Sequence, residues 1–169
     1  MKVRLTSYDD SWKNFFENEC KVMRQIFGDE IVGFEHFGST SVPGMKEKPV
    51  VDMMMLVKNI DDIDKFNSKL EMLGYDVAGE WGIDGRRLLR KGGDNRTHHI
   101  HIYQFDHSEI YRHLAVRDYL LEHPEEVKLY SGFKEELASK YDETREYSKA
   151  KKEFVSKLEH RAIEYFSIK

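Results

Sequence analysis

The first third of the chain changes from helical to extended hydrophobic spacing. Apolar side chains recur near helical spacing over residues 11–27 and Gly28 follows them, which predicts a helix of about four turns. Residues 31–37 have the composition of a strand. Small residues and prolines over 38–49 predict a loop with at most one helical turn. The nearly continuous apolar run over 50–57 predicts an interior strand covered on both faces.

The middle of the chain predicts a helix followed by a hairpin. Residues 59–73 begin with a polar cap and carry apolar side chains at helical spacing. We expect a short strand at 75–78. Residues 86–91 and 97–105 have strand patterns and are joined by the Gly-Gly-Asp-Asn turn at 92–95, so they form a predicted hairpin.

The last third of the chain has only helical patterns. Its three predicted helices span residues 108–122, 124–140 and 143–167. Together these patterns predict an α+β fold, in which residues 1–106 form a mixed sheet with helices and residues 107–169 form a C-terminal helical segment packed on it. The length of 169 residues suits a single domain of this kind.

The composition is that of a globular protein and excludes several classes. Hydrophobic residues make up 40% of the chain and charged residues 34%, and the net charge of −4 argues against bulk nucleic-acid binding. Residues 1–6 lack the apolar core of a signal peptide, and no segment approaches the roughly 18 apolar residues of a membrane span. We therefore expect a cytoplasmic protein. Its one cysteine, Cys20, fits a small buried hydrophobic residue better than a nucleophile.

The candidate chemistry starts at the loop after the first predicted strand. Gly38 is followed by Ser39, Thr40 and Ser41, so a turn of small residues leaves the strand. Backbone N–H groups and hydroxyls in such a turn can hold a phosphate. Asp52 follows within the apolar run of the next predicted strand, where a carboxylate can hold a metal ion.

Each of the three C-terminal helices carries a cation on its apolar stripe: Arg117, Lys134 and Lys151. The three stripes consist of Ile110, Leu114 and Leu121, of Tyr130, Leu137 and Tyr141, and of Tyr147, Phe154, Leu158 and Tyr165. A cation in such a position either reaches water at the edge of the stripe or pairs with an anion, because burying it alone costs several kcal/mol. The anion is either a carboxylate of the protein, such as Asp118 or Asp52, or a bound phosphate.

The predicted strand at 97–105 contains three histidines. Alternation along the strand places His99 and His101 on one face and the third histidine on the other. With Asp52 as a third ligand, this pair suits zinc, iron or manganese, and Glu35 and His36 are further candidates close to the turn. Hydrogen-bonded histidines and histidines that contact a substrate are the alternatives.

Three motifs together resemble the GrpB family, an uncharacterised protein family. They are GSTSVPGM at 38–45, KPVVD at 48–52 and HIH at 99–101. Residues similar to the family's terminal signatures are Tyr8 and Trp12 near the start, and Arg117 to Leu120, Lys134, Tyr147 and Lys151 near the end. The resemblance covers essentially the whole chain.

The resemblance implies a nucleotidyltransferase of the polymerase-beta-like fold. In that superfamily a Gly-Ser turn holds the nucleotide phosphates, and two carboxylates on one strand face hold two divalent cations that assist the transfer. Gly38 and Ser39 match the turn and Asp52 matches the first carboxylate, but Met54 occupies the position of the second. The carboxylate set is therefore incomplete, and whether the protein is an enzyme stays open at this point.

The resemblance also implies roles for individual residues. Asp52, His99 and His101 are the expected catalytic residues and the expected ligands of a divalent metal, magnesium or manganese in preference to zinc. The residues expected to bind a phosphate or nucleotide are Gly38, Ser39, Thr40, Ser41, Lys48, Arg117, Lys134, Tyr147 and Lys151.

Three hypotheses for function follow. The first is an enzyme that transfers a nucleotidyl or phosphoryl group and whose partner is a nucleotide or phosphorylated metabolite. Related GrpB sequences joined to dephospho-coenzyme A kinase hint at nucleotide or coenzyme A metabolism. The second is a catalytically inactive sensor or adaptor that binds a nucleotide or anion. The third, a ribonuclease, rests only on the spacing from Arg117 to His123.

Overall fold

The computed structural model describes residues 5–141 and 144–168. The chain divides into two compact units, which are described separately. The first consists of Asp10–Phe37 and Val50–Ile110 and is called the sheet unit. None of the described helices is long and apolar enough to cross a membrane.

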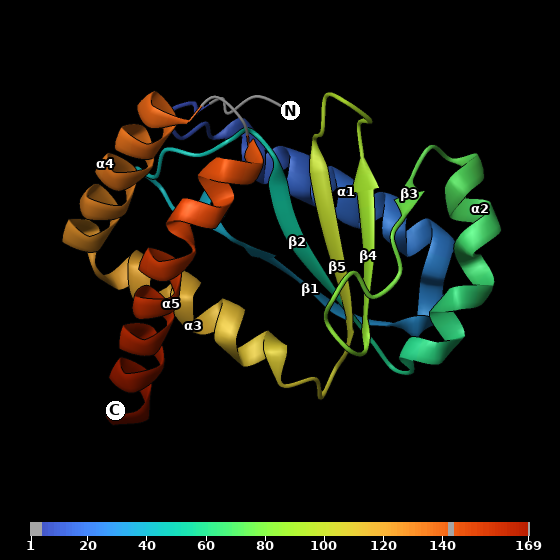
Figure 1. Ribbon diagram of the computed structural model, residues 1–169. Helices are drawn as coiled ribbons and strands as arrows, with labels where there is room; N and C mark the ends of the chain where they lie inside the picture. Colours follow the sequence, from blue (N-terminus) through green and yellow to red (C-terminus); the bar gives the residue numbers. More distant parts are fainter. Residues whose placement is uncertain (1–4, 142–143, 169) are drawn as a thin grey trace. The chain divides into compact units, whose positions relative to one another are not determined.

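The sheet unit contains one five-stranded mixed sheet, with the strand order β1-β2-β5-β4-β3 (Figure 1). The strands are β1 (Ile31–Phe37), β2 (Val51–Val57), β3 (Asp76–Val77), β4 (Arg86–Lys91) and β5 (His98–Gln104). Strands β2 and β5 pair in parallel, and the other neighbouring pairs are antiparallel. The predicted strands and the predicted hairpin are confirmed, and with the helices they make the protein α+β.

Strand β2 is interior, as its apolar run predicts. It lies between β1 and β5, and its side chains alternate between the two faces of the sheet. Met53, Met54 and Met55 are all fully buried, so both faces are covered at this strand. A polar side chain on β2 therefore lies among buried neighbours.

Two helical segments pack on one face of the sheet. Helix α1 (Ser11–Phe27) is followed by the 3-10 turn η1 (Gly28–Glu30), and the second segment consists of the 3-10 helix η3 (Ile60–Phe66) and helix α2 (Asn67–Met72). The core between helices and sheet includes Cys20, Met23, Phe27, Met53, Met55, Ile63, Leu70, Ile100 and Ile102.

Two expectations for this face have clear outcomes. Cys20 is buried in the core, as expected, and burial raises the pKa of its thiol to about 11. The predicted helix at 59–73 is an α-helix only in its second half. Its first half contains Asp61, Asp62 and Asp64, and short polar side chains of this kind compete for backbone hydrogen bonds, as Asn59 does when it accepts from the N–H of Asp61.

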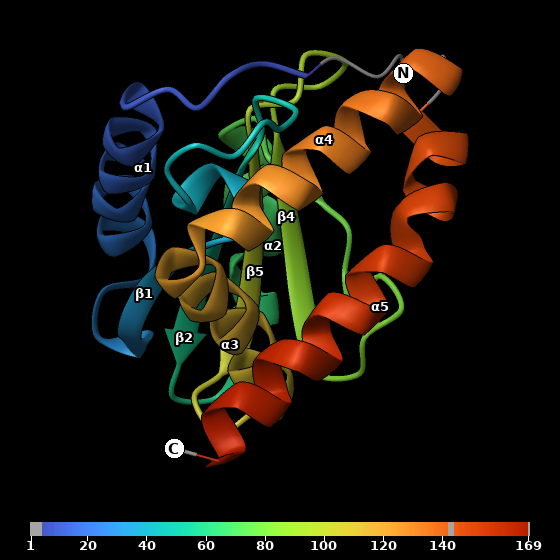
Figure 2. The ribbon, with the colours of Figure 1, turned by 90° about the vertical axis from the view of Figure 1, so that its left-hand side faces the viewer.

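The second unit, called the helical unit, consists of the described residues up to Asp9, of Gly38–Pro49 and of the chain from Tyr111 onward. Its helices are η2 (Ser39–Ser41), α3 (Glu109–Glu122), α4 (Pro124–Lys140) and α5 (Thr144–Ile168). Their core consists of Val42, Met45, Ala115, Tyr119, Leu120, Val127, Tyr130, Leu158 and Ala162. Figure 2 shows α3 to α5 in gold to red.

This grouping differs from the expected boundary between residues 106 and 107. The described residues up to Asp9 and the loop at 38–49 join the C-terminal helices, and residues 107–110 join the sheet unit. The loop at 38–49 groups with the C-terminal helices, because it packs against α4 through Val42, Met45 and its hydrogen bonds to that helix. The single helical turn expected in the loop is η2. The predicted start of the last helix, residue 143, lies outside the described residues.

Candidate functional site

Asp52, His99 and His101 converge on one face of the sheet. Asp52 on β2 pairs with His99 on β5, and His101 lies two residues further along the same face. The Oδ1 atom of Asp52 lies 3.2 Å from Nε2 of His101 and 3.7 Å from Nδ1 of His99. One potential ligand atom from each residue lies within 4.8 Å of the others. The alternation expected along β5 is thus confirmed, and we call these residues the Asp–His cluster.

The surroundings of Asp52 keep its carboxylate ionised. Burial on its own raises the pKa of Asp52. Hydrogen bonds from His101 and His99, together with their charge, more than offset this, so the net pKa lies well below the usual range of an aspartate. The cluster therefore offers one ionised carboxylate beside two histidine side chains.

A buried arginine, Arg86 on β4, contacts His101 of the cluster. It donates to the backbone oxygens of Trp81 at 2.7 Å and Glu80 at 3.2 Å, and its NH1 lies 3.3 Å from Nδ1 of His101. A guanidinium only donates, so Nδ1 of His101 is the acceptor and Nε2–H donates to Asp52. Sequence reasoning missed Arg86, because the strand pairing that brings it to His101 is visible only in the fold.

The donor set fits one divalent metal ion and not two. Met54 occupies the same-face position two residues after Asp52 and is fully buried, so it supplies no second carboxylate. Among the described residues, Glu35 and His36, the further candidate ligands, are not part of the cluster. Glu35 pairs with Met54 in the sheet, and His36 stacks on Phe16 of α1 at the opposite face. One oxygen and two nitrogens suit manganese, iron or zinc better than magnesium.

The helical unit has a polar centre of its own around Lys134. The Lys134 side chain is fully buried, and its Nζ donates to Ser39 Oγ at 2.6 Å, to Glu47 Oε2 at 3.0 Å and to the backbone oxygen of Lys46 at 3.2 Å. Burial lowers the pKa of Lys134 to about 8, although the Glu47 carboxylate opposes this. Lys134 is therefore buried on the apolar stripe of its helix, and its side chain is paired with an anion of the protein.

That anion is Glu47, which sequence reasoning missed. Burial raises the pKa of Glu47, but Lys134 and Lys151 lower it further, to about 2. The charge of Lys48 acts on Lys134 as well. Lys134 is thus influenced by the carboxylate of Glu47 and by the ammonium groups of Lys151 and Lys48.

Tyr147 lies among these lysines with a buried polar atom. Its side chain is fully buried, and its hydroxyl has no hydrogen-bond partner among the described residues. The ammonium groups of Lys151 and Lys48 lie 5.3 Å and 5.7 Å from the centre of its ring. Buried hydroxyls are normally paired, so an unpaired one beside two cations needs an explanation. We call Tyr147, Lys48, Lys134 and Lys151, with Glu47, the lysine cluster.

The small-residue turn belongs to the helical unit and contributes to this cluster. Gly38 has a φ of 72°, a conformation that favours glycine, and Ser41 donates to its backbone oxygen. Ser39 and Thr40 are buried, and Ser39 accepts from Lys134. The structure thus brings Ser39, Lys48, Lys134, Tyr147 and Lys151 into one unit, as expected for a shared site.

The buried face of the helix at 108–122 differs from the expected apolar stripe. Helix α3 buries Ala115, Tyr119 and Leu120, whereas Leu121 is 48% exposed. Tyr119 selects this face because its ring packs on His123 and Tyr165. Arg117 is not among these buried residues, but only 18% of its side chain is exposed, and its Nε donates at 2.9 Å to Asp118, one of the carboxylates named for it.

The fold and the two clusters define an α+β protein with a carboxylate–histidine centre on its sheet and a lysine-rich centre among its helices. A family model described as GrpB protein matches residues 2–161. The chain therefore belongs to the GrpB family, as the sequence motifs indicate.

Known relatives agree with this assignment. The chain is 39% identical over 162 residues to the UPF0157 protein YqkA of Bacillus subtilis, covering 95% of the chain and 47% of the relative. It thus spans about half the length of that relative. It is 31% identical to the Glutamate-rich protein GrpB of Alkalihalophilus pseudofirmus, covering 93% of the chain and 94% of the relative. The crystal structure of the conserved protein GrpB from Enterococcus faecalis has a TM-score of 0.92 and 41% identity, over 96% of this chain and 99% of that one.

Proposed function

We propose that the protein binds a nucleotide or another phosphorylated small molecule, and that its phosphate is held by the lysine cluster. The observation that carries this proposal is the buried Tyr147. Its hydroxyl has no partner among the described residues, and its ring centre lies 5.7 Å from the ammonium group of Lys48 and 5.3 Å from that of Lys151. A phosphate oxygen accepts hydrogen bonds and attracts ammonium groups, so it satisfies both features at once.

The charge balance of the helical unit supports the same ligand. Glu47 pairs with Lys134, and the ammonium group of Lys151 also acts on Glu47, so positive charge is concentrated around this carboxylate and attracts anions. Ser39, whose hydroxyl already accepts from Lys134, has its own proton to donate. Gly38, Thr40, Ser41 and Arg117 are retained as binding residues on the family resemblance alone.

The Asp–His cluster is proposed to hold one divalent metal ion that acts on a phosphoryl group, in a nucleotidyltransferase-type fold. Asp52, His99 and His101 would hold the ion, and manganese suits this mixed donor set better than magnesium. Such an ion polarises a phosphoryl oxygen. Asp52 would supply the ionised ligand, and the two imidazoles would complete the ligand set.

Calorimetric titration with nucleoside triphosphates, coenzyme A precursors and inorganic tripolyphosphate tests the phosphate site. We expect Lys151→Ala to weaken binding at least tenfold, and the neighbouring exposed Lys152→Ala to leave it unchanged. If no phosphorylated probe binds the wild-type protein, or if the two variants bind alike, the proposed phosphate site does not exist.

A manganese titration tests the Asp–His cluster separately. Asp52→Asn should abolish binding of the ion, whereas His36→Gln, on the other face of the sheet, should not. Manganese binding that survives in Asp52→Asn would place the ion elsewhere. Neither measurement depends on the identity of the acceptor.

A catalytically inactive sensor or adaptor is the second candidate function. It is favoured by Met54, which leaves the cluster with a single carboxylate. This alternative predicts that ligand binding survives EDTA and that the pure protein turns over no nucleoside triphosphate in the presence of acceptors. Metal-dependent turnover, lost in Asp52→Asn, would rule it out.

A further inference from the structure

An exposed tryptophan stands on a rigid loop of the sheet unit. Trp81 lies in the loop between β3 and β4, residues 78–85, and 61% of its surface is exposed. Its φ of 48° is a left-handed conformation that a bulky residue rarely adopts. Strain of this kind persists only where the surroundings hold the backbone in place, and it concentrates at binding sites.

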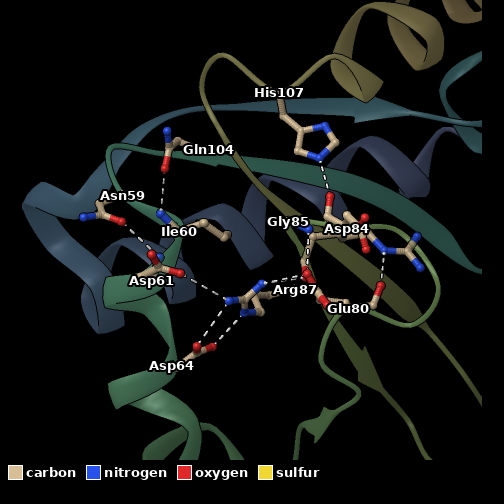
Figure 3. A network of polar contacts seen from close by, with 11 residues as sticks. Asn59, Ile60, Asp61, Asp64, Glu80, Asp84, Gly85, Arg87, Gln104 and His107 are labelled. Carbon is tan, nitrogen blue, oxygen red and sulfur yellow. Dashed lines mark hydrogen bonds and ion pairs between the residues drawn. The ribbon is translucent and has the colours of Figure 1, made fainter.

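Polar contacts hold the loop in place, as Figure 3 shows. The carboxylate of Glu80 accepts from the N–H of Gly85 at 2.7 Å, and His107 donates to the backbone oxygen of Asp84 at 2.6 Å. Arg87 makes two hydrogen bonds to Asp64, at 2.7 and 3.2 Å, and lies 3.9 Å from Glu80. These contacts explain how the loop keeps Trp81 in its strained conformation.

Arg86 connects the same loop to the Asp–His cluster. Its guanidinium donates to the backbone oxygen of Trp81 and also reaches Nδ1 of His101. Within strand β4, Arg86 and Arg90 alternate onto the sheet face that carries His101 and His99. The loop is therefore positioned over the face of the sheet on which the cluster lies.

Arg90 links the Trp81 ring to this face. Its guanidinium carbon lies 4.6 Å from the centre of the Trp81 ring, and Arg90 pairs with His99 in the sheet. Arg90 also forms an ion pair with Asp76, yet its Nε atom is buried with no hydrogen-bond partner among the described residues. The guanidinium covers one side of the ring, and more than half of the side-chain surface stays open.

We infer that Trp81 and Arg90 form a platform for an aromatic base, so that the phosphorylated compound proposed for the Asp–His cluster of the same unit is a nucleotide. This inference rests on the proposed function and specifies its ligand. A base stacks on the open surface of the Trp81 ring, since stacking on tryptophan needs only a π-face and a fixed platform. Arg90 supports the opposite side of the ring, where its guanidinium carbon lies 4.6 Å from the ring centre.

Paired titrations test the platform. The probes are the four ribonucleoside monophosphates and ribose 5-phosphate, which lacks a base, and binding is followed by calorimetry and by tryptophan fluorescence. Trp12, the second tryptophan, is buried, so quenching by a ligand reports on Trp81. Trp81→Ala should weaken the binding of nucleotides by about 5- to 150-fold and leave ribose 5-phosphate unaffected. Trp81→Phe should retain most of the affinity.

Two further variants serve as controls. Phe105→Ala removes another exposed aromatic residue of the sheet unit and should change nothing. Trp81→Gly removes the ring and also the backbone strain, so it keeps the test valid if Trp81→Ala folds poorly.

The outcomes separate the two proposals. If the wild-type protein binds ribose 5-phosphate as tightly as the nucleotides and Trp81→Ala changes neither, the platform is refuted while the phosphate site stands. If no phosphorylated probe binds at all, both proposals fail. If Trp81→Ala changes the oligomeric state in light scattering but leaves nucleotide affinity unchanged, Trp81 is a protein contact and the inference is wrong.

Discussion

The ammonium group of Lys134 lies 3.0 Å from a carboxylate oxygen of Glu47, and the two residues are 87 positions apart in the chain. Lys134 is fully buried, and Glu47 has only 12% of its side chain exposed. The pair joins the loop at 38–49 to α4, and the positive charge of Lys151 acts on both of its members. Stability and anion binding should therefore both depend on it.

The Glu47 carboxylate should make the protein sensitive to acid. Its pKa is lowered from 4.5 to about 2, so between these values the unfolded chain binds a proton that the folded chain does not. Stability is thus fully present above pH 4.5 and falls as the pH drops toward 2, by on the order of 3 kcal/mol. Urea unfolding between pH 6 and 3 should show this loss in wild type and less of it in Glu47→Gln. Glu153→Gln, 82% exposed, is the control and should behave as wild type.

Replacing Lys134 alone should be more harmful than replacing the pair. Lys134→Met leaves the Glu47 carboxylate buried without its hydrogen-bonded partner, which typically costs about 3–5 kcal/mol. The double variant, Lys134→Met with Glu47→Gln, has no buried carboxylate left without a partner. It should therefore be more stable than the sum of the two single changes predicts. Urea unfolding of the four proteins measures this coupling. Additive effects within 0.5 kcal/mol, roughly the error for independent sites, would mean that the pair has no energetic role.

Much of the fold could be predicted because its elements have strong, simple patterns. The apolar run of β2 and the Gly-Gly turn between β4 and β5 both predict what the structure contains. Two features could not be predicted from the sequence. The 3-10 start of the segment at 60–66 depends on local hydrogen bonding by aspartates, and the buried face of α3 depends on the stacking of Tyr119 with residues beyond that helix.

The candidate site was predictable in its residues and not in its partners. Asp52, His99 and His101 could be grouped from strand alternation, because neighbouring strands align same-face residues. Glu47 and Arg86 could not be recognised, since each is one charged residue among others until the fold brings it to Lys134 or His101. Buried atoms without partners, such as Nε of Arg90, have no sequence signal at all.

Two adjacent glycines in the hairpin turn between β4 and β5, Gly92 and Gly93, should differ in the stability cost of their substitution by alanine. A Cβ at Gly92, where φ is +104°, would lie 2.3 Å from the backbone oxygen of Asn95, whereas a Cβ at Gly93 would meet nothing within 4 Å. Gly93→Ala should therefore cost about 1–2 kcal/mol for its left-handed conformation alone. Gly92→Ala should cost at least twice as much, because the backbone of the turn must move. Thermal or urea unfolding of the two variants checks the order, and equal losses would contradict it.

The hydroxyl of Tyr147 should have opposite effects on stability and on binding. It is buried without a partner among the described residues, so Tyr147→Phe removes a desolvation cost and should stabilise the ligand-free protein by about 1–3 kcal/mol. The same change removes a donor from the proposed phosphate site and should weaken tripolyphosphate binding about tenfold, the loss of one charge-assisted hydrogen bond. Unfolding in urea and calorimetric titration measure the two effects on one variant. Tyr130→Phe, on the neighbouring helix, is the matched control and should leave the affinity unchanged. A Tyr147→Phe protein that gains stability but binds tripolyphosphate like wild type would show that the hydroxyl does not face the ligand.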